Sequence, residues 1–312
     1  MSDLLKVERR GHTAILTMNN PPANTWTPES LKLLQQTIAE LNADADNYAL
    51  VLASESEKFF SAGADLKRFH HDDTGAAYEF IKAFGIAFDA LANYRGVAIA
   101  AITGFAMGGG LECALACDIR VAEEQAQMAL PECTVGLLPG GLGTQHLPWL
   151  VGEGWAKRMI LLGERVTAQK ALEIGLVQEV VPTGKALEKA LELAAKVEGQ
   201  SPPSVRVCKE LIMSARHRSL DSGFQFERLI RLIPPGVAAG LLAGILLPFG
   251  IKALGGLSVD PTLAGLLIVA YVLLKRVTAR YAVVGILALG LAFLLVQNRV
   301  AIAQPRLPAA VQ

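Results

Sequence analysis

Three long runs without a charged residue lie at the end of this chain, and they limit what it can fold into. They span residues 235–251, 261–274 and 281–296. Each is shorter than the ~20 residues that cross a bilayer upright, although the first can be extended through Lys252, which would snorkel near a helix end. We therefore interpret residues 235–298 as two to three apolar helices of membrane type. Buried core helices of a soluble protein are the alternative.

The distribution of charge separates the same part of the chain from the rest. Residues 229–312 carry seven basic side chains and one acidic side chain, a net charge of +6, whereas residues 1–228 carry a net charge of −6. Such asymmetry indicates two segments with different surroundings. The sequence therefore predicts two domains, 1–228 and 229–312.

The composition of the whole chain excludes several classes of protein. The 312 residues contain 29 basic and 29 acidic side chains, so no basic excess indicates a nucleic-acid partner. Hydrophobic residues make up 52% of the chain, which excludes a disordered protein, and four cysteines are too few for a disulfide scaffold. Because the first residues lack the apolar stretch of a secretory signal, we expect a cytoplasmic domain.

Residues 1–228 follow the pattern of an α/β protein. Strand-like and helical segments alternate, which indicates parallel strands joined by crossover helices. Thr27 and Pro28 are expected to begin one helix, as N-cap and first helical residue, and Thr167 is expected to cap another. The expected strands are 4–8, 13–18, 48–53, 97–103 and 176–181, and the expected helices are 28–41, 76–94 and 168–174.

Glycines in this part of the chain suggest a site for an oxygen that carries negative charge. The triple glycine 108–110 comes directly before a helix, where backbone N–H groups lack an acceptor within the helix and a shielding side chain. With a second N–H from the turn at Gly63 and Ala64, it would form an oxyanion hole. The alternative is that these glycines only permit close packing.

Two glutamates stand among apolar neighbours. Glu112 is in the first turn of the helix that follows the triple glycine, and Glu132 lies between two apolar segments. Such carboxylates are poor candidates for solvated surface charges, and a pair of them could hold a water, one accepting its proton and the other donating one. For Glu112 the alternative is a structural interaction with the helix N-terminus.

Other candidate sites are weaker. Cys113 and Cys117 are four residues apart on a helix but lack further metal ligands, so small core residues are the simpler interpretation. The segment 70–73, His-His-Asp-Asp, is interpreted as a solvated loop. Ser61 and His146 lack an evident triad partner. No G-x-G-x-x-G stands in the right place and no phosphate-loop motif occurs, so neither a nucleotide site nor a metal site is predicted.

Together these residues resemble the crotonase superfamily, the enoyl-CoA hydratase/isomerase family, over residues 1–228. The resemblance rests on NPPANT (20–25), SAGADL (61–66), MGGGLE (107–112), PE (131–132) and LPGGLGT (138–144). It implies an α/β fold with a β-β-α spiral core that binds acyl-CoA, in a homotrimer or a hexamer.

The resemblance also implies roles for individual residues. The N–H groups of Ala64 and Gly109 would hold the thioester oxygen, and Glu112 and Glu132 would be the catalytic pair. Gly140 would orient the water. The substrate-binding residues would be Ala23, Ala64, Asp65, Leu66, Lys67 and Gly109. Coenzyme A would be part of the substrate, so no separate cofactor is expected.

The tail resembles a different family. Residues 234–238 (PPGVA), 241–250 (LLAGILLPFG) and 275–276 (Lys-Arg) are similar to an internal piece of a benzoate:proton symporter. A transporter needs many spans around a central site, so two or three segments predict no transport. The simplest interpretation is a fusion that replaces the terminal helices of the first family, with possible membrane association through residues 235–298.

Both glutamates are present, and that pairing favours hydration within the family. The sequence therefore predicts a lyase, an enoyl-CoA hydratase that adds water across the trans-2 double bond of an enoyl-CoA thioester. The alternatives are an enoyl-CoA isomerase of the same family, a chimera that binds acyl-CoA without turnover, and a component of membrane transport.

Overall fold

The computed structural model describes residues 4–66 and 74–216. They belong to the first of two units into which the chain divides, Met1–Leu220 and Asp221–Gln312. Lys67, the loop 70–73, the three uncharged runs and the predicted membrane association all lie outside the described residues. The structure therefore gives no support to a transmembrane helix or to a fusion.

A six-stranded sheet forms the centre of the described part, in the order β1-β2-β4-β7-β9-β12. Its first two strands pair antiparallel and all the others pair parallel. The sequence of β7 is apolar throughout and that of β4 is apolar up to its last residue, Ser54, because central parallel strands are buried on both faces. The prediction of parallel crossover units is confirmed. The six strands are β1 (Leu5–Arg10), β2 (Thr13–Met18), β4 (Ala49–Ser54), β7 (Val97–Ile102), β9 (Ile119–Glu123) and β12 (Glu179–Val181).

Shorter strands and the helices complete a repeating β-β-α pattern. Each of β4, β7 and β9 is followed by a strand of a second sheet, ordered β11-β10-β8-β5, and then by a helix. The short strands are β3 (Thr25–Trp26), β5 (Phe59–Ser61), β6 (Gly63–Ala64), β8 (Phe105–Met107), β10 (Gln127–Ala129) and β11 (Val166–Thr167). The helices are α1 (Pro28–Ala43), α2 (Thr74–Ala92), α3 (Gly109–Leu115), α4 (Gly143–Leu161), α5 (Ala168–Glu173), α6 (Ala186–Glu198) and α7 (Pro202–Ser214), with a 3-10 turn η2 (Glu132–Val135).

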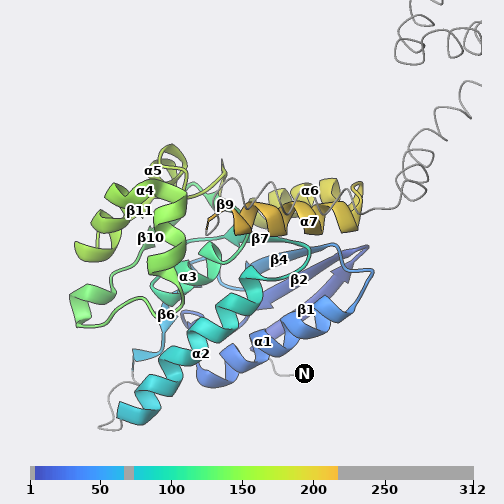
Figure 1. Cartoon of the computed structure of the whole chain (residues 1–312). Coiled ribbons are helices and arrows are strands. Elements are labelled where there is room, and N and C mark those ends of the chain that lie inside the picture. The colour runs from blue at the N-terminus through green and yellow to red at the C-terminus, as the bar shows by residue number, and fades with distance from the viewer. Residues whose placement is uncertain (1–3, 67–73, 217–312) are drawn as a thin grey trace, which may run out of the picture. The chain divides into compact units, whose positions relative to one another are not determined.

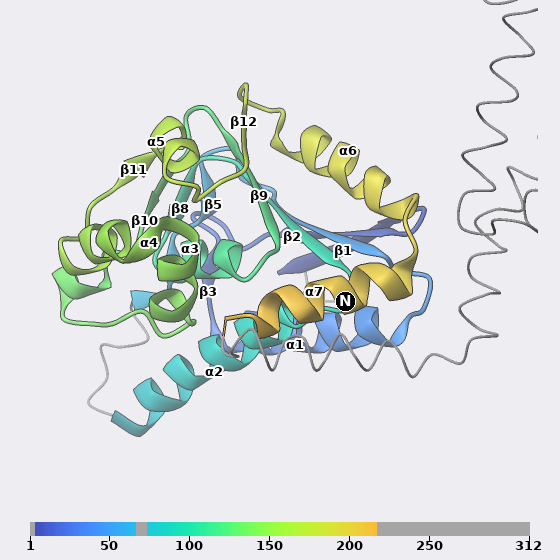
Figure 2. The ribbon, with the colours of Figure 1, turned by 45° about the horizontal axis from the view of Figure 1, so that its top comes forward.

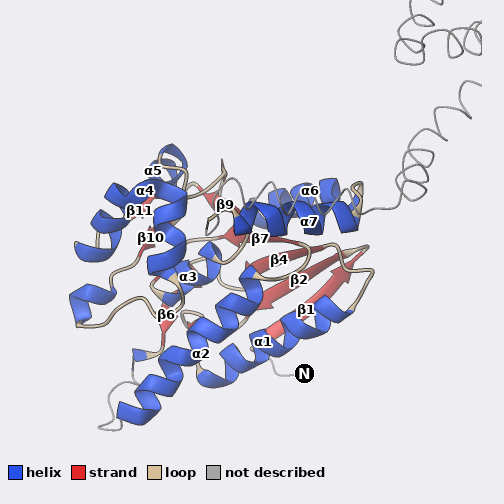
Figure 3. Ribbon diagram, in the orientation of Figure 1, coloured by secondary structure: helices blue, strands red, loops and turns tan. Residues whose placement is uncertain are grey.

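Helices cover both faces of the six-stranded sheet (Figure 1; Figure 3, sheet in red). On one face α6 presents Ala186, Ala190 and Ala194, and these small side chains allow the helix to pack closely against β4, β7 and β9. On the other face α1 and α2 pack against each other and enclose the larger apolar core. The helix that carries Glu112, α3, packs against α2 and α4 and against strands of the smaller sheets.

Most of the predicted element boundaries agree with the structure. Thr27 caps α1 and forms a capping box with Ser30, and Thr167 caps α5 by accepting from the N–H of Lys170. Within the strand predicted over 176–181, only residues 179–181 pair with another strand. The prediction is wrong for residues 176–178. The N–H of Leu176 instead donates to Ala171 O at 2.8 Å, which closes the turn after α5.

No helix within residues 4–66 and 74–216 combines the length and apolar character needed to cross a membrane.

The last described helix is attached to the sheet through one partly buried ammonium group. α6 and α7 are joined at one end and diverge from there (Figure 2). Lys209 Nζ of α7 donates to Asp118 Oδ2 at 2.7 Å, to Tyr94 O at 2.7 Å and to Gly96 O at 3.1 Å. Asp118 Oδ2 also accepts from the N–H of Ala98, the second residue of β7. This cluster therefore links α7 to the sequence around the beginning of β7 and the residue before β9.

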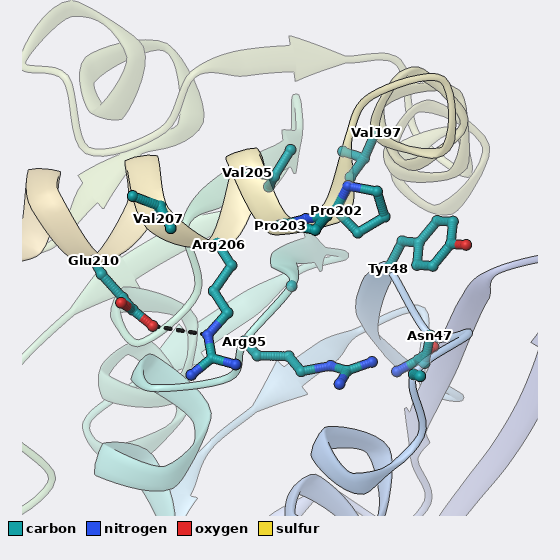
Figure 4. Close-up of a pocket in the computed structure, with 12 residues that line it drawn as sticks. Asn47, Tyr48, Arg95, Val197, Pro202, Pro203, Val205, Arg206, Val207 and Glu210 are labelled. Atoms are coloured by element: carbon teal, nitrogen blue, oxygen red, sulfur yellow. Dashed lines mark hydrogen bonds and ion pairs between the residues drawn. The ribbon is translucent and has the colours of Figure 1, made fainter. Parts of the chain in front are cut away.

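We expect Lys209→Ala to lower the free energy of unfolding by about 1.5–3 kcal/mol, because it leaves a partly buried carboxylate without its charged partner. Arg206→Ala on the same helix is the matched control. Arg206 forms an exposed ion pair with Glu210 at 2.8 Å (Figure 4), so its removal should cost under about 1 kcal/mol. Urea denaturation of both variants measures the difference, and equal losses would contradict this account of α7.

Candidate active site

A close approach of backbone places β6 against the first turn of α3. Gly63 has φ +88°, a left-handed conformation that favours glycine. A Cβ at this position would lie 2.6 Å from Met107 O and 3.0 Å from Gly109 N. Only glycine fits there, and it brings the following residue, Ala64, next to the beginning of α3.

Ala64 and Gly109 line one cavity of about 400 Å³. Gly109 is the first residue of α3, so its N–H has no acceptor inside the helix. The cavity is also lined by Asp65, Leu66 and Glu132, and further by Thr25, Ala62, Met107, Gly108, Pro131, Thr134, Val135 and Leu137. Two segments that are far apart in the sequence thus meet at a single hollow.

Glu112 lies in the interior, with 2% of its surface exposed. Its Oε1 accepts hydrogen bonds from the N–H of Gly141 at 2.8 Å and of Gly143 at 2.7 Å. The pKa of the carboxyl is raised to about 8, chiefly by burial and in smaller part by the charge of Glu132, while the two N–H donors oppose the rise. With Oε1 occupied by two donors, Oε2 is the oxygen that can carry the proton.

Glu132 is half-buried in the turn η2. Burial is the main cause that raises the pKa of its carboxyl to about 7, and a hydrogen bond from the backbone partly opposes this rise. Its Oε2 is buried, and no hydrogen-bond partner is found for it within the described part of the chain. An unpaired buried oxygen is costly unless a ligand or a water supplies the missing donor. The carboxyl is therefore poised to interact with an occupant of the cavity.

A second, smaller cavity adjoins the first. It has a volume of about 40 Å³ and is lined by Glu112, Gly140, Ile81, Phe84, Leu138, Gly109 and Leu137. Gly109 and Leu137 line both cavities. Because a water needs roughly 10–15 Å³ of such space, the smaller cavity is large enough for a water beside Glu112. The two carboxylates thus face neighbouring parts of one site.

The structure brings most of the predicted site residues together. Ala64, Asp65, Leu66, Gly109 and Glu132 line the larger cavity, and Glu112 and Gly140 line the smaller one. Ala23 is not among the described lining residues, and its carbonyl accepts from the N–H of Ala62 at 2.9 Å. Lys67 lies outside the described residues.

Several residues of the site were not predicted from the sequence. Gly141 and Gly143 belong to the motif at 138–144 but had no predicted role, yet their N–H groups donate to the Glu112 carboxylate. Ile81 and Phe84 come from α2, far from any motif. For Phe84 a signal existed, because Phe80, Phe84 and Phe88 repeat every four residues, as expected of a buried helix face.

The weaker candidates occupy structural positions. Cys113 and Cys117 are buried, and burial raises the pKa of the Cys117 thiol to about 12, so neither is a thiolate at neutral pH. Ser61 Oγ donates to Asn24 O at 2.6 Å. Burial lowers the pKa of His146 to about 4, and its ring lies 3.3 Å from the Arg216 guanidinium. Within 4–66 and 74–216, no cluster of three or more His, Cys, Asp or Glu side chains could hold a metal.

Two larger cavities lie elsewhere. One of about 640 Å³ is shown in Figure 4, where Arg95, Arg206 and the prolines at the beginning of α7 surround it. Tyr48 and Gly96, which precede β4 and β7, also line it. The other, of about 690 Å³, lies between α7 and residues 115–120. Neither is lined by Glu112 or Glu132.

The raised pKa of Glu112 predicts a pH-dependent gain in stability for Glu112→Gln. The usual pKa of 4.5 applies to the unfolded chain and about 8 to the folded protein. The folded state therefore binds more protons between these values, and the contribution of Glu112 to stability falls as the pH rises through them. A neutral amide avoids this loss, so we expect Tm to rise by roughly 4–10 °C at pH 9 and by under about 1 °C at pH 5.

Calorimetry at the two pH values measures the effect, with the exposed Glu57→Gln as control. A Tm for Glu112→Gln at pH 9 that equals or falls below that of the unsubstituted protein would contradict the burial argument.

Two family models match the chain. The model described as enoyl-CoA hydratase/isomerase matches residues 8–231, and the model described as benzoate membrane transport protein matches residues 221–311. The two matches overlap at residues 221–231. The boundary predicted at 228/229 stays a prediction.

Relatives of known name cover the same part of the chain. A putative enoyl-CoA hydratase/isomerase of Bacillus subtilis, YngF, is 40% identical over 229 residues, 72% of this chain and 87% of its own length. The short-chain-enoyl-CoA hydratase of Clostridium acetobutylicum is 36% identical over 71% of this chain and 85% of its own length. The 2,3-dehydroadipyl-CoA hydratase of Escherichia coli is also 36% identical, over 73% of this chain and 88% of its own.

The fold of this chain is similar to that of several solved structures. DspI of Pseudomonas aeruginosa is 58% identical with a TM-score of 0.72, over 75% of this chain and 96% of that one. The enoyl-CoA hydratase of Bacillus anthracis is 35% identical with a TM-score of 0.71, over 77% of this chain and 95% of that one. With its β-β-α core and its paired glutamates, the chain belongs to the enoyl-CoA hydratase/isomerase family, the crotonase family, whose enzymes act on acyl-CoA thioesters.

Proposed function

We propose that the protein is an enoyl-CoA hydratase, a lyase that adds water across the trans-2 double bond of an enoyl-CoA thioester. The observation that carries the proposal is the placement of Glu112 and Glu132 in two adjoining cavities that share Gly109. A hydratase needs a water beside the β-carbon and a polarised thioester, and these cavities offer room for both.

The thioester oxygen would be held by the N–H groups of Ala64 and Gly109. Attack of water at C3 moves the π electrons toward this oxygen, and two N–H donors stabilise the resulting enolate. One such donor contributes roughly 3–4 kcal/mol in comparable sites. The close approach of Gly63 to the beginning of α3 supports this assignment, because it brings the two backbone segments together.

The two carboxyl groups would divide the proton transfers. The ionised member of the pair takes a proton from the attacking water, whose oxygen bonds to C3. The protonated member donates its proton to C2, and the thioester carbonyl re-forms. The pair supports this because burial raises both pKa values toward neutrality, so that one proton is shared near pH 7–8. Gly140 would help to orient the water beside Glu112.

The remaining assignments extend the same proposal. Ala23, Asp65, Leu66 and Lys67 would line the path of coenzyme A, which is part of the substrate, and no separate cofactor is proposed. A homotrimer or hexamer, a cytoplasmic catalytic domain and a membrane association of residues 235–298 stay predictions.

We expect purified protein to hydrate crotonyl-CoA, and Glu112→Gln and Glu132→Gln each to lower kcat by about 10²–10⁴, because each removes one proton transfer. Loss of the enoyl thioester absorbance measures the rate. Glu57→Gln, an exposed substitution in the same part of the chain, should keep the full rate. Conversion of a 3-enoyl-CoA to its 2-enoyl isomer without any hydration would contradict the proposal in favour of an isomerase.

The shared proton also predicts the pH dependence. The active form has one carboxyl protonated and one ionised, so kcat/KM should follow a bell with apparent pKa values near 7 and 8, which belong to the pair. Initial rates between pH 5.5 and 9.5 test this. A rate that is flat across that range would show that the pair does not exchange protons in the reaction.

A further inference from the structure

In the proposed reaction, the acyl chain beyond C3 would extend from the carboxylate pair into the smaller cavity. Apart from Glu112 and backbone at two glycines, the described walls of this cavity are the side chains of Ile81, Phe84, Leu137 and Leu138. Its volume is about 40 Å³, a tenth of the 400 Å³ on the side where coenzyme A would enter. The space is enough for a water or a methyl-sized group and too small for a long chain.

We propose that Ile81 and Leu138 close the acyl end of the site, so that it takes enoyl-CoA thioesters with a short, uncharged chain. This inference rests on the proposed hydratase function and names its substrate class.

One wall of the cavity is fixed by aromatic packing. Phe84 is buried, and its ring centroid lies 5.1 Å from that of Phe80 and 5.6 Å from that of Phe88. A Cβ at Gly109 would lie 2.6 Å from Phe84 Cε1, so the ring already rests against the backbone at the beginning of α3. An acyl chain cannot displace Phe84 without disturbing the core.

A further part of the wall is formed where α2 meets the loop before α4. A Cβ at Gly140 would lie 2.8 Å from Ile81 Cγ2, and one at Gly85 would lie 3.6 Å from Gly140 O. Ile81 therefore lies directly against the loop at Gly140. Leu138 is 66% exposed, so removing its side chain opens the cavity without leaving a hole in the core.

The charge of the cavity restricts the chain further. Glu112 is the one ionisable side chain among the described residues that line it, and it is already costly to ionise because it is buried. A chain that ends in a carboxylate would bring an unpaired negative charge into this apolar space. The site should reject such substrates.

The test compares kcat/KM for crotonyl-CoA, trans-2-decenoyl-CoA and 2,3-dehydroadipyl-CoA. We expect the protein to prefer crotonyl-CoA by at least about tenfold over either of the others, since a single misfitted methylene changes specificity by about 10–200-fold. Leu138→Ala and Ile81→Ala should raise the ratio of decenoyl to crotonyl turnover by about tenfold or more. Neither should rescue dehydroadipyl-CoA, because the remaining walls still offer no cationic partner for its carboxylate.

Ile86→Ala is the matched control, since Ile86 is a 44% exposed residue of α2 outside the described lining of both cavities. It should leave the ratio unchanged. Equal turnover of crotonyl and decenoyl substrates by the unsubstituted protein, or an unchanged ratio in both variants, would overturn the inference while leaving the hydratase function standing. Failure to hydrate any of the three would instead overturn the proposed function, and this inference with it.

Discussion

The site depends on the two hydrogen bonds that the Glu112 carboxylate accepts from the backbone of Gly141 and Gly143. They join α3 to the loop that begins α4, two elements separated by about thirty residues of sequence. Both glycines are required, because a Cβ at Gly143 would lie 2.8 Å from Glu112 Oε1 and one at Gly141 would lie 2.9 Å from Oε2. The same contacts place Gly140 beside the carboxylate and determine the shape of the smaller cavity.

The electrostatic state of the site follows from this burial. A carboxyl removed from water ionises reluctantly, and two N–H donors to one oxygen compensate only in part. Glu132, at the edge of the larger cavity, is affected less, so its pKa is raised to about 7 rather than about 8. Proteins commonly accept such a cost in stability at catalytic sites. Two groups with similar, raised pKa values suit proton exchange near neutral pH.

The motifs allowed most of the fold and part of the site to be predicted. Apolar strands, the caps at Thr27 and Thr167 and the order of elements depend on local sequence, and the structure reproduces them. The half of the 176–181 segment that forms no strand shows the limit. Leu176 is buried and apolar, as a strand residue would be, but a hydrogen bond to Ala171 holds it in a turn. Hydrophobicity indicates burial and cannot by itself distinguish a strand from a buried turn.

The sequence by itself determined which residues have the chemistry: two glutamates in apolar surroundings, glycines before a helix, and the division of charge at the tail. Only the tertiary structure decided that Glu112 and Glu132 face adjoining cavities, and that Ile81 and Phe84 of α2 line the same cavity as Gly140. The reason is physical. Residue type and local pattern fix hydrogen-bonding capacity and helix faces, whereas contacts between α2, α3 and the loop before α4 depend on how the helices pack, which no local pattern encodes.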